Sequence, residues 1–393
     1  MIPEYWLWIV LALLPMAALT GWWTARRGMR HADYRQPSGM HPDYFKGLNF
    51  VLNEQPDKAI EVFIRMLEVD SETIETHLAL GNLFRRRGEV DRAIRIHQNL
   101  IARPTLNHEQ RATALLELGM DYMRSGLLDR AEGLFLELVE SGHHTVQAYQ
   151  QLQDIYQQEK DWPQAIAAAR RLEFMSGEDL KPVIAQYYCE LADLDLSGDR
   201  EKAARDNLRR ALNLDPRSVR ASMLEGEIAR RQGKPRVAIK FYKRVEQQDP
   251  EFIPEIIEPL LQCYGELNKM DEFVVYVKSL LDNYGGITPA LYVTDILARS
   301  EGEDEAIRFI SSELKKHPTV RGVDRLLEYT VSRSQGETRE NLITVKDLTR
   351  RLLENHPVYK CRQCGFDARN LHWQCPGCKH WNTVKPVQGV QGE

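Results

Sequence analysis

The chain lacks the sequence motifs of the common enzyme classes. Its 393 residues contain no Walker loop, no H-E-x-x-H pair, no G-x-S-x-G turn and no glycine-rich dinucleotide fingerprint. An excess of positive charge is missing as well, because the net charge is −5 and both signs are spread along the chain. Nucleic-acid binding depends on a basic surface. We therefore predict that the protein is not an enzyme and that it does not bind nucleic acid.

Cysteine is scarce, and its distribution is uneven. The chain has six cysteines, and four of them lie within the last 35 positions. This clustering argues against a secreted disulfide framework and favours one local metal site in a reducing compartment. The other two, Cys189 and Cys263, lie on predicted helices, where we expect them to be small buried apolar residues.

Charge is absent between Tyr5 and Ala25, where the chain reads YWLWIVLALLPMAALTGWWTA. A helix of this length spans about 30 Å, which matches the hydrocarbon core of a bilayer. Tryptophans prefer the membrane interface and lie near both ends of the run, at Trp6, Trp8, Trp22 and Trp23. We predict a transmembrane anchor over residues 1–25.

Two alternatives to an anchor are a cleaved signal peptide and a buried core helix. A signal peptide needs basic residues ahead of its apolar run, whereas here Glu4 comes before the run and Arg26 and Arg27 follow it. A buried core helix would need other segments to cover a surface that is apolar on all sides, and the sequence that follows offers none. Since the arginines follow the span, the positive-inside rule places the carboxyl-terminal bulk in the cytoplasm, after a basic linker at residues 26–41.

An internal repeat fills the middle of the chain. Short turn motifs end at regular intervals, with spacings of 33 to 38 residues, at Ala59, Ala93, Ala131, Ala165, Ala203, Ala238, Phe273 and Ala306. This period is typical of tetratricopeptide repeats, each of which is a pair of helices. We predict an all-α solenoid of about eight units over residues 42–318; an ordinary helical bundle is the alternative.

Small and aromatic residues recur at fixed places within the repeat. We expect the glycines to lie where the two helices of one repeat cross, and the rings to fill the space between neighbouring repeats. The glycines are Gly47, Gly81, Gly119 and Gly226, and the rings are Phe63, Phe135 and Tyr242. Repeat arrays bind peptides or proteins on a concave surface, and Asn82, Arg85 and Arg86 are candidate partner contacts there.

Residues 319–357 are predicted to close the array with two amphipathic helices. One is expected around Val323–Val331 and the other around Leu342–Leu353, with the polar stretch SRSQGETRE between them.

Two C-x-x-C pairs, Cys361 with Cys364 and Cys375 with Cys378, follow these helices. A two-residue spacing lets one tight turn direct both thiolates at one ion, and two such turns give tetrahedral coordination by four sulfurs. We predict a metal-binding domain over residues 358–387 and a tail over 388–393. With four cysteines the site has no open position, so we expect the ion to be structural; disulfides are the alternative.

The spacing does not separate zinc from iron. The Cys-Gly after the first pair and the Cys-Pro in the second resemble rubredoxin, although Lys379 stands where rubredoxins usually have glycine. We expect Phe366, Trp373 and Trp381 to form the small core of this domain, since an ion replaces most of a hydrophobic core. His372 and His380 are expected at the surface.

The order of these parts resembles one bacterial family. The uncharged span, GNLFRRRGEVDRAIRIHQ at residues 81–98 and the closing YKCRQCGF and CPGC together resemble the lipopolysaccharide assembly protein B family. The resemblance covers essentially the whole chain. It implies a single-pass protein of the bacterial inner membrane that presents the lipid A pathway deacetylase LpxC to the membrane protease FtsH.

The resemblance also implies metal binding by all four cysteines and control by an inner-membrane regulator of lipopolysaccharide synthesis. A homodimer is possible, because arrays of this kind often pair. Two other functions stay open at this stage: an assembly platform for lipopolysaccharide enzymes without a proteolytic role, and a rubredoxin-like electron carrier.

Overall fold

The computed structural model describes residues 42–69, 73–354 and 356–393. The predicted anchor and the basic linker lie outside the described residues, and so do Trp6, Trp8, Trp22, Trp23, Arg26 and Arg27. Within the part that is described, no helix combines the length and the apolar character needed to cross a bilayer. The chain divides into two compact units, residues 1–145 and residues 146–393.

The described part of the first unit consists of three helical hairpins. They are α2 (Pro42–Leu52) with α3 (Pro56–Val69), α4 (Ile74–Arg86) with α5 (Val90–Ile101), and α6 (His108–Ser125) with α7 (Leu128–Ser141). Caps fix the ends of α6: Asn107 and Gln110 form a reciprocal capping box at its start, and Gly126 ends it with φ +78°. Within this unit the second helix of one hairpin packs on the first helix of the next, as α3 does on α4 and α5 on α6.

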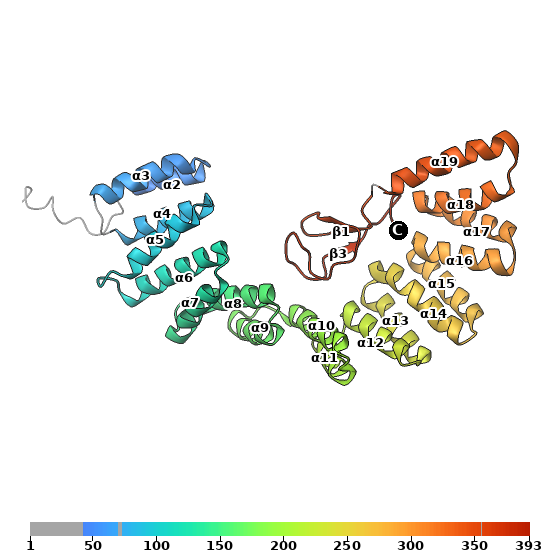
Figure 1. Cartoon of the computed structure of the whole chain (residues 1–393), viewed down its shortest axis with the longest axis horizontal. Helices are drawn as coiled ribbons and strands as arrows, with labels where there is room; N and C mark the ends of the chain where they lie inside the picture. The colour runs from blue at the N-terminus through green and yellow to red at the C-terminus, as the bar shows by residue number, and fades with distance from the viewer. Residues whose placement is uncertain (1–41, 70–72, 355) are drawn as a thin grey trace, which may run out of the picture. The chain divides into compact units, whose positions relative to one another are not determined.

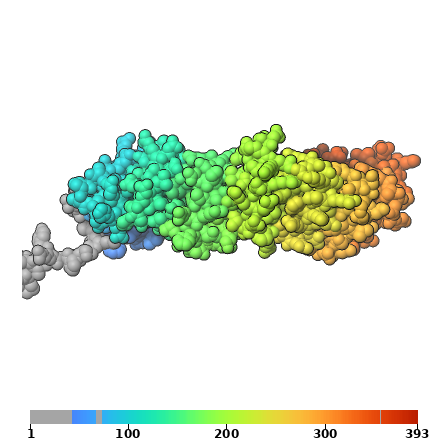
Figure 2. All heavy atoms as spheres, turned by 90° about the horizontal axis from the view of Figure 1, so that it is seen from below, coloured from blue at the N-terminus to red at the C-terminus, as the bar shows by residue number. Residues whose placement is uncertain are grey.

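The second unit continues the same pattern and ends in a small sheet. Its hairpins are α8 (Thr145–Glu159) with α9 (Trp162–Ser176), α10 (Lys181–Ser197) with α11 (Glu201–Leu214), α12 (Val219–Arg231) with α13 (Pro235–Gln248), α14 (Ile253–Glu266) with α15 (Met270–Tyr284), and α16 (Ile287–Ser300) with α17 (Glu303–Lys316). A short 3-10 helix, η1 (Pro250–Phe252), precedes α14. In Figure 2 the surfaces of these repeats follow one another in chain order, from green to orange, as nearest-neighbour stacking requires. The predicted all-α repeat array is confirmed.

Glycine lies at the helix crossing of four repeats, as expected. A Cβ atom on Gly47, Gly119 or Gly226 would lie 2.6 Å from a ring of the second helix in the same repeat. Those rings are Phe63, Phe135 and Tyr242. The expectation that the rings fill the space between neighbouring repeats was therefore incomplete, because each is seated over the glycine of its own repeat. In the α4–α5 repeat, His97 takes the place of the ring over Gly81.

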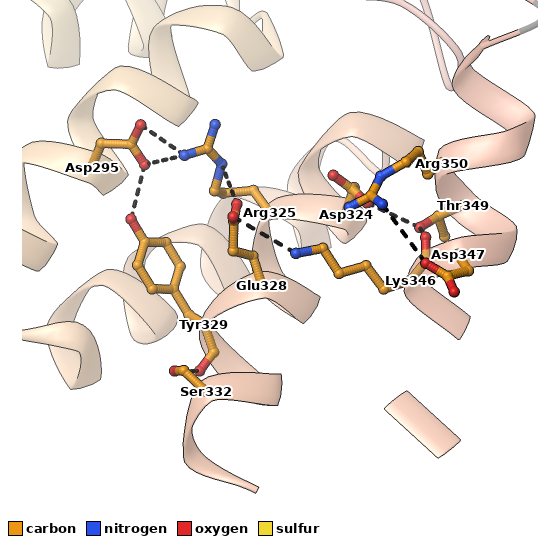
Figure 3. Close-up of polar contacts among 10 residues, drawn as sticks. All are labelled: Asp295, Asp324, Arg325, Glu328, Tyr329, Ser332, Lys346, Asp347, Thr349 and Arg350. Carbon is orange, nitrogen blue, oxygen red and sulfur yellow. Dashed lines mark hydrogen bonds and ion pairs between the residues drawn. The ribbon is translucent and has the colours of Figure 1, made fainter. Parts of the chain in front are cut away.

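The last two helices, α18 (Val320–Arg333) and α19 (Gly336–Glu354), continue the array as a further hairpin. Arg325 of α18 forms two hydrogen bonds with Asp295 of α16, at 2.7 and 2.8 Å, and the Tyr329 hydroxyl donates to the same carboxylate at 2.9 Å (Figure 3). The predicted polar break is shorter than expected. Gly336 adopts φ +63°, and the polar residues after it already belong to α19, where their side chains are exposed.

A three-stranded antiparallel sheet follows α19. Strands β1 (Tyr359–Cys361), β2 (Asp367–Ala368) and β3 (Val384–Pro386) are ordered β2-β1-β3, with Cys361 opposite Val384. Figure 1 shows this segment leaving the end of α19 and turning back beside the repeats of the second unit. We call residues 358–393 the carboxyl-terminal module.

Candidate metal centre and its contacts with the repeats

Four thiols converge at one point of the module. The Sγ atoms of Cys361, Cys364, Cys375 and Cys378 all lie within 4.8 Å of one another, and none forms a disulfide. The Sγ atoms of Cys361 and Cys378 are 3.7 Å apart, and those of Cys364 and Cys375 are 3.6 Å apart. A tetrahedron of sulfurs with metal bonds of about 2.3 Å has edges of about 3.8 Å. The geometry fits one tetrahedral ion, zinc or iron.

Two matching turns present the thiols. In the first, the amide of Gly365 donates to the carbonyl of Cys361, and Gly365 has φ +78°. In the second, the amide of Lys379 donates to the carbonyl of Cys375, and Lys379 has φ +61°. Lysine therefore adopts the left-handed conformation that glycine provides in the first turn, at a cost of about 1 kcal/mol. The absence of glycine at position 379 leaves the shape of the turn unchanged.

The thiols have unequal affinities for protons. Burial raises the pKa of Cys361, but a hydrogen bond with the Thr383 hydroxyl and hydrogen bonds from two backbone amides outweigh burial and lower that pKa to about 6. The Phe366 amide lowers the pKa of Cys364, whereas burial and the three neighbouring thiols raise it to about 12. Four thiolates this close repel one another, so a bound cation is what would stabilise full ionisation. This donor set fits a metal ion.

The remaining two cysteines are fully buried in repeat helices, as predicted. Burial raises the pKa of Cys189 to about 12 and that of Cys263 to about 11. Thiols with such a high pKa are poor nucleophiles and poor metal ligands. They therefore serve as packing residues of α10 and α14.

Trp381 of the module lies against the first repeats of the second unit. Its Nε1 donates to Gln157 Oε1 of α8 at 3.0 Å, and its ring meets Trp162 and Tyr187 edge-on at 6.2 and 5.8 Å. Gln374 of the module also donates to Gln157 Oε1, at 3.2 Å. These contacts join the module to helices α8, α9 and α10.

Trp373 and Lys385 contact repeats further along. The Trp373 ring stacks on Phe252 of η1, with centroids 5.3 Å apart, and the buried Arg220 of α12 lies 5.8 Å from the Trp373 centroid. Lys385 pairs with Asp249 and lies 4.1 Å from the Phe252 ring. The two tryptophans were expected in the core of the metal domain. That expectation was wrong, because both rings pack on repeat helices.

Other residues of the module contact η1, α14, α16 and α18. Tyr359 donates to Glu255 at 2.7 Å, and Arg362 pairs with Glu251 at 2.8 Å. The Glu393 carboxylate accepts hydrogen bonds from the Thr288 amide at 2.9 Å and the Thr288 hydroxyl at 2.5 Å, and it pairs with Arg321. With these contacts, the module touches every hairpin of the second unit from α8–α9 to α18–α19. The α10–α11 hairpin is contacted through Tyr187.

Comparisons with known proteins find relatives of both the repeats and the four-cysteine module. Residues 359–386 match a family described as rubredoxin metal binding domain, and residues 76–109 and 189–251 match tetratricopeptide-repeat families. Over 385 residues the chain is 37% identical to lipopolysaccharide assembly protein B of Escherichia coli strain K12, covering 98% of this chain and 99% of that protein. The chain belongs to the lipopolysaccharide assembly protein B family. The Haemophilus influenzae protein of the same name is 34% identical over 393 residues, again covering 98% of this chain and 99% of the other.

The chain is also similar to solved structures of repeat proteins. The chain is 22% identical to MamA over 47% of its own length and 95% of that protein, with a TM-score of 0.33. In this member of the lipopolysaccharide assembly protein B family, the four-cysteine module packs on the repeats.

The candidate partner residues of α4 are placed in different surroundings. Asn82 and Arg86 line a cavity of about 360 Å³ in the first unit, together with apolar side chains that include Leu48, Leu78 and Leu83. The Asn82 Oδ1 atom is buried and has no hydrogen-bond partner among the residues that the structure describes. An unsatisfied buried acceptor is costly, and a ligand donor would relieve that cost.

The third candidate, Arg85, forms ion pairs with a neighbouring repeat. Its guanidinium pairs with Glu117 at 2.6 Å and with Asp121 at 2.8 Å, both on α6. Burial alone would lower the pKa of Arg85, but the hydrogen bonds and charges of these two carboxylates outweigh burial and raise it. Arg85 therefore joins two repeats, unlike Asn82 and Arg86, which face the cavity.

A buried polar network was missed at the sequence level. Asp121 and His97 are fully buried, and His97 Nδ1 lies 2.5 Å from the second oxygen of Asp121. Arg85, Asp121 and His97 thus form one chain of contacts through the α4–α5 and α6–α7 hairpins. The available signal was His97 itself, which occupies the place that a large ring takes in three other repeats.

Replacing Trp381 with alanine is expected to weaken the attachment of the module. The change removes the hydrogen bond to Gln157 and the ring contacts with Trp162 and Tyr187. Loss of a packed tryptophan costs about 3 kcal/mol. Hydrogen exchange should become faster in α8 and in the second C-x-x-C turn, while metal content stays stoichiometric.

The matched control is Phe366→Ala, which removes a ring of the module that is 36% exposed and meets only His372 among the aromatic residues described. It should leave exchange in α8 unchanged. Equal effects of the two substitutions would contradict a specific role for Trp381 in docking.

Proposed function

We propose that this protein is an inner-membrane adaptor that regulates lipopolysaccharide synthesis by presenting LpxC to the protease FtsH. Membership of the lipopolysaccharide assembly protein B family supports a role in lipopolysaccharide assembly. The proposed adaptor is anchored by residues 1–25, with Trp6, Trp8, Trp22 and Trp23 at the membrane interfaces and Arg26 and Arg27 on the cytoplasmic side. Confinement to the membrane would raise its effective concentration near a membrane protease.

In this proposal, one zinc or iron ion is held by Cys361, Cys364, Cys375 and Cys378. The ion is structural, and its function is to keep the module in the shape that fits the repeats. The observation that carries the proposal is the extent of this fit, since module contacts reach from Gln157 of α8 to Arg321 of α18. A rigid repeat scaffold with a preset surface is suited to holding two proteins, not to turning over a substrate.

The client would bind in the first unit, at the cavity lined by Asn82 and Arg86. The apolar walls suit aliphatic side chains of a peptide segment, and the buried Asn82 Oδ1 would accept one backbone N–H of that segment. Arg85 is excluded from this contact by its ion pairs with Glu117 and Asp121.

The decisive measurement is the half-life of LpxC in cells with and without this protein, beside a control substrate of FtsH. We expect a longer LpxC half-life in the absence of the protein and no change for the control substrate. An unchanged LpxC half-life would contradict the adaptor function and favour the assembly platform. A reversible redox couple, with function lost when zinc replaces iron, would favour the electron carrier.

Within the adaptor, Asn82→Ala should lengthen the LpxC half-life while the protein level stays normal. Arg87→Ala is the matched control for charge at this end of α4, because Arg87 pairs with Asp57 and Glu89 and does not line the cavity. Normal LpxC turnover with Asn82→Ala and Arg86→Ala combined would place the client elsewhere.

A further inference from the structure

The outer face of α19 carries an uncovered apolar stripe. Val345, Leu348 and Leu352 are 44%, 54% and 56% exposed. Their spacing of three and four residues places them on one face of the helix. A neighbouring face is in contact with α18, where Thr349 donates to Asp324 at 3.2 Å and Lys346 lies 3.7 Å from Glu328 (Figure 3).

This stripe lies where an array would add another repeat. Earlier second helices pack on the first helix of the following hairpin, as α13 does on α14 and α17 on α18. Among the described residues α19 has no following hairpin, and none of its own residues is fully buried. The end of a soluble repeat array normally has a polar outer face. An apolar end therefore indicates a surface that is covered by a partner.

The charges beside the stripe indicate which partner. At about 100° per residue, Glu337, Glu340 and Arg351 fall along the same edge of the stripe. The acidic residues lie near the start of α19 and Arg351 lies near its end. When two identical helices pair in antiparallel fashion, each edge meets the same edge of its partner, so the acidic end of one copy lies beside the basic end of the other.

The spacing of the residues in the stripe also fits an antiparallel pair of identical helices. Asn341, Val345, Leu348 and Leu352 are spaced four, three and four residues apart, so the pattern reads the same in both directions. An antiparallel pair centred between Val345 and Leu348 aligns Val345 of each copy with Leu348 of the other, and places Glu340 within about 3 Å along the axis of Arg351 in the other copy. We propose that two copies of this chain pair through antiparallel contact of their α19 helices.

The contact is small. One face of a 19-residue helix provides less than the roughly 800 Å² per partner of a standard interface. Pairing would therefore be weak in dilute solution and would depend on confinement in the membrane, which rests on the proposed anchor.

Cross-linking of the full chain in native membranes tests the pairing. Leu348→Cys, treated with a short bismaleimide, is expected to give a product of twice the chain mass. Ile343→Cys is the matched control, because Ile343 is 40% exposed but lies on the opposite side of α19. The unmodified chain serves as the blank, since Cys364 is exposed. A product of another mass, no product, or equal products at both positions would overturn the proposal.

Charge reversal tests the partner's identity and direction. In the Leu348→Cys chain, Glu340→Arg should lower the yield of the dimer about tenfold, because it places two arginines side by side. Adding Arg351→Glu should restore the yield, since both copies then carry the reversed pair. Failure of the double reversal to restore the yield would overturn the antiparallel pairing. These outcomes do not depend on LpxC turnover, so they are separable from the test of the adaptor function.

Discussion

Cys361→Ser is expected to release the module from the repeats and to abolish function. Cys361 is 2% exposed and lies within 4.8 Å of the other three thiols, so the substitution removes one of four ligands from a closed site. A structural zinc contributes about 10–16 kcal/mol to the folding of a small metal domain, more than the remaining core of the module would supply. We expect loss of bound metal, faster hydrogen exchange along the docking surface from α8 to α16, and a long LpxC half-life.

The control for this substitution is Cys263→Ser, which changes a buried thiol of α14 and leaves the four-cysteine cluster intact. Its metal content and LpxC turnover should match those of the unmodified protein. Removing the metal from the unmodified chain with a chelator should reproduce the exchange pattern of Cys361→Ser. Full function in a metal-free protein would contradict a structural role for the ion.

Asp121→Ala is expected to destabilise the first unit by about 3–5 kcal/mol, because it leaves buried cationic or polar groups without their partner. Asp121 is fully buried, and it binds Arg85 at 2.8 Å and His97 at 2.5 Å. The change therefore acts on two hairpins at once. Hydrogen exchange of α4, α5 and α6 measures the effect for this unit separately, which a single melting curve of the whole chain does not.

Asp129→Ala is the control, since Asp129 is an exposed carboxylate at the start of α7. It should change exchange by less than about 0.5 kcal/mol. Adding His97→Phe to Asp121→Ala should recover part of the loss, because phenylalanine occupies the same place over glycine in the α2–α3 and α6–α7 hairpins. Equal exchange in Asp121→Ala and Asp129→Ala would show that the buried network contributes little.

The two predictions concern different kinds of constraint. The metal cluster stabilises a module too small to fold on its apolar core, and the module in turn joins distant repeats through Trp381, Trp373 and Glu393. The Arg85–Asp121–His97 network joins adjacent hairpins only. Damage to the metal cluster should spread over the second unit, whereas damage to the Arg85–Asp121–His97 network should stay within the first unit.

The sequence by itself determined the repeat and the four-cysteine cluster, because both are encoded by local spacing. Glycines recur where helices cross, and the C-x-x-C pairs fix two turns that each present two thiols. These features depend on residues a few positions apart, or on one repeated period, so they can be predicted without knowledge of distant contacts.

The tertiary structure alone decided where the module binds and which polar residues are buried. Trp381 meets Gln157 across 224 positions, and Glu393 meets Thr288 across 105, so no local pattern links these residues. A tryptophan beside a metal ligand fits a small core and a docking surface equally well in sequence, and only packing distinguishes them. His97 and Asp121, likewise, are polar residues by composition, and they can be buried because they pair with each other across two hairpins while Arg85 also pairs with Asp121.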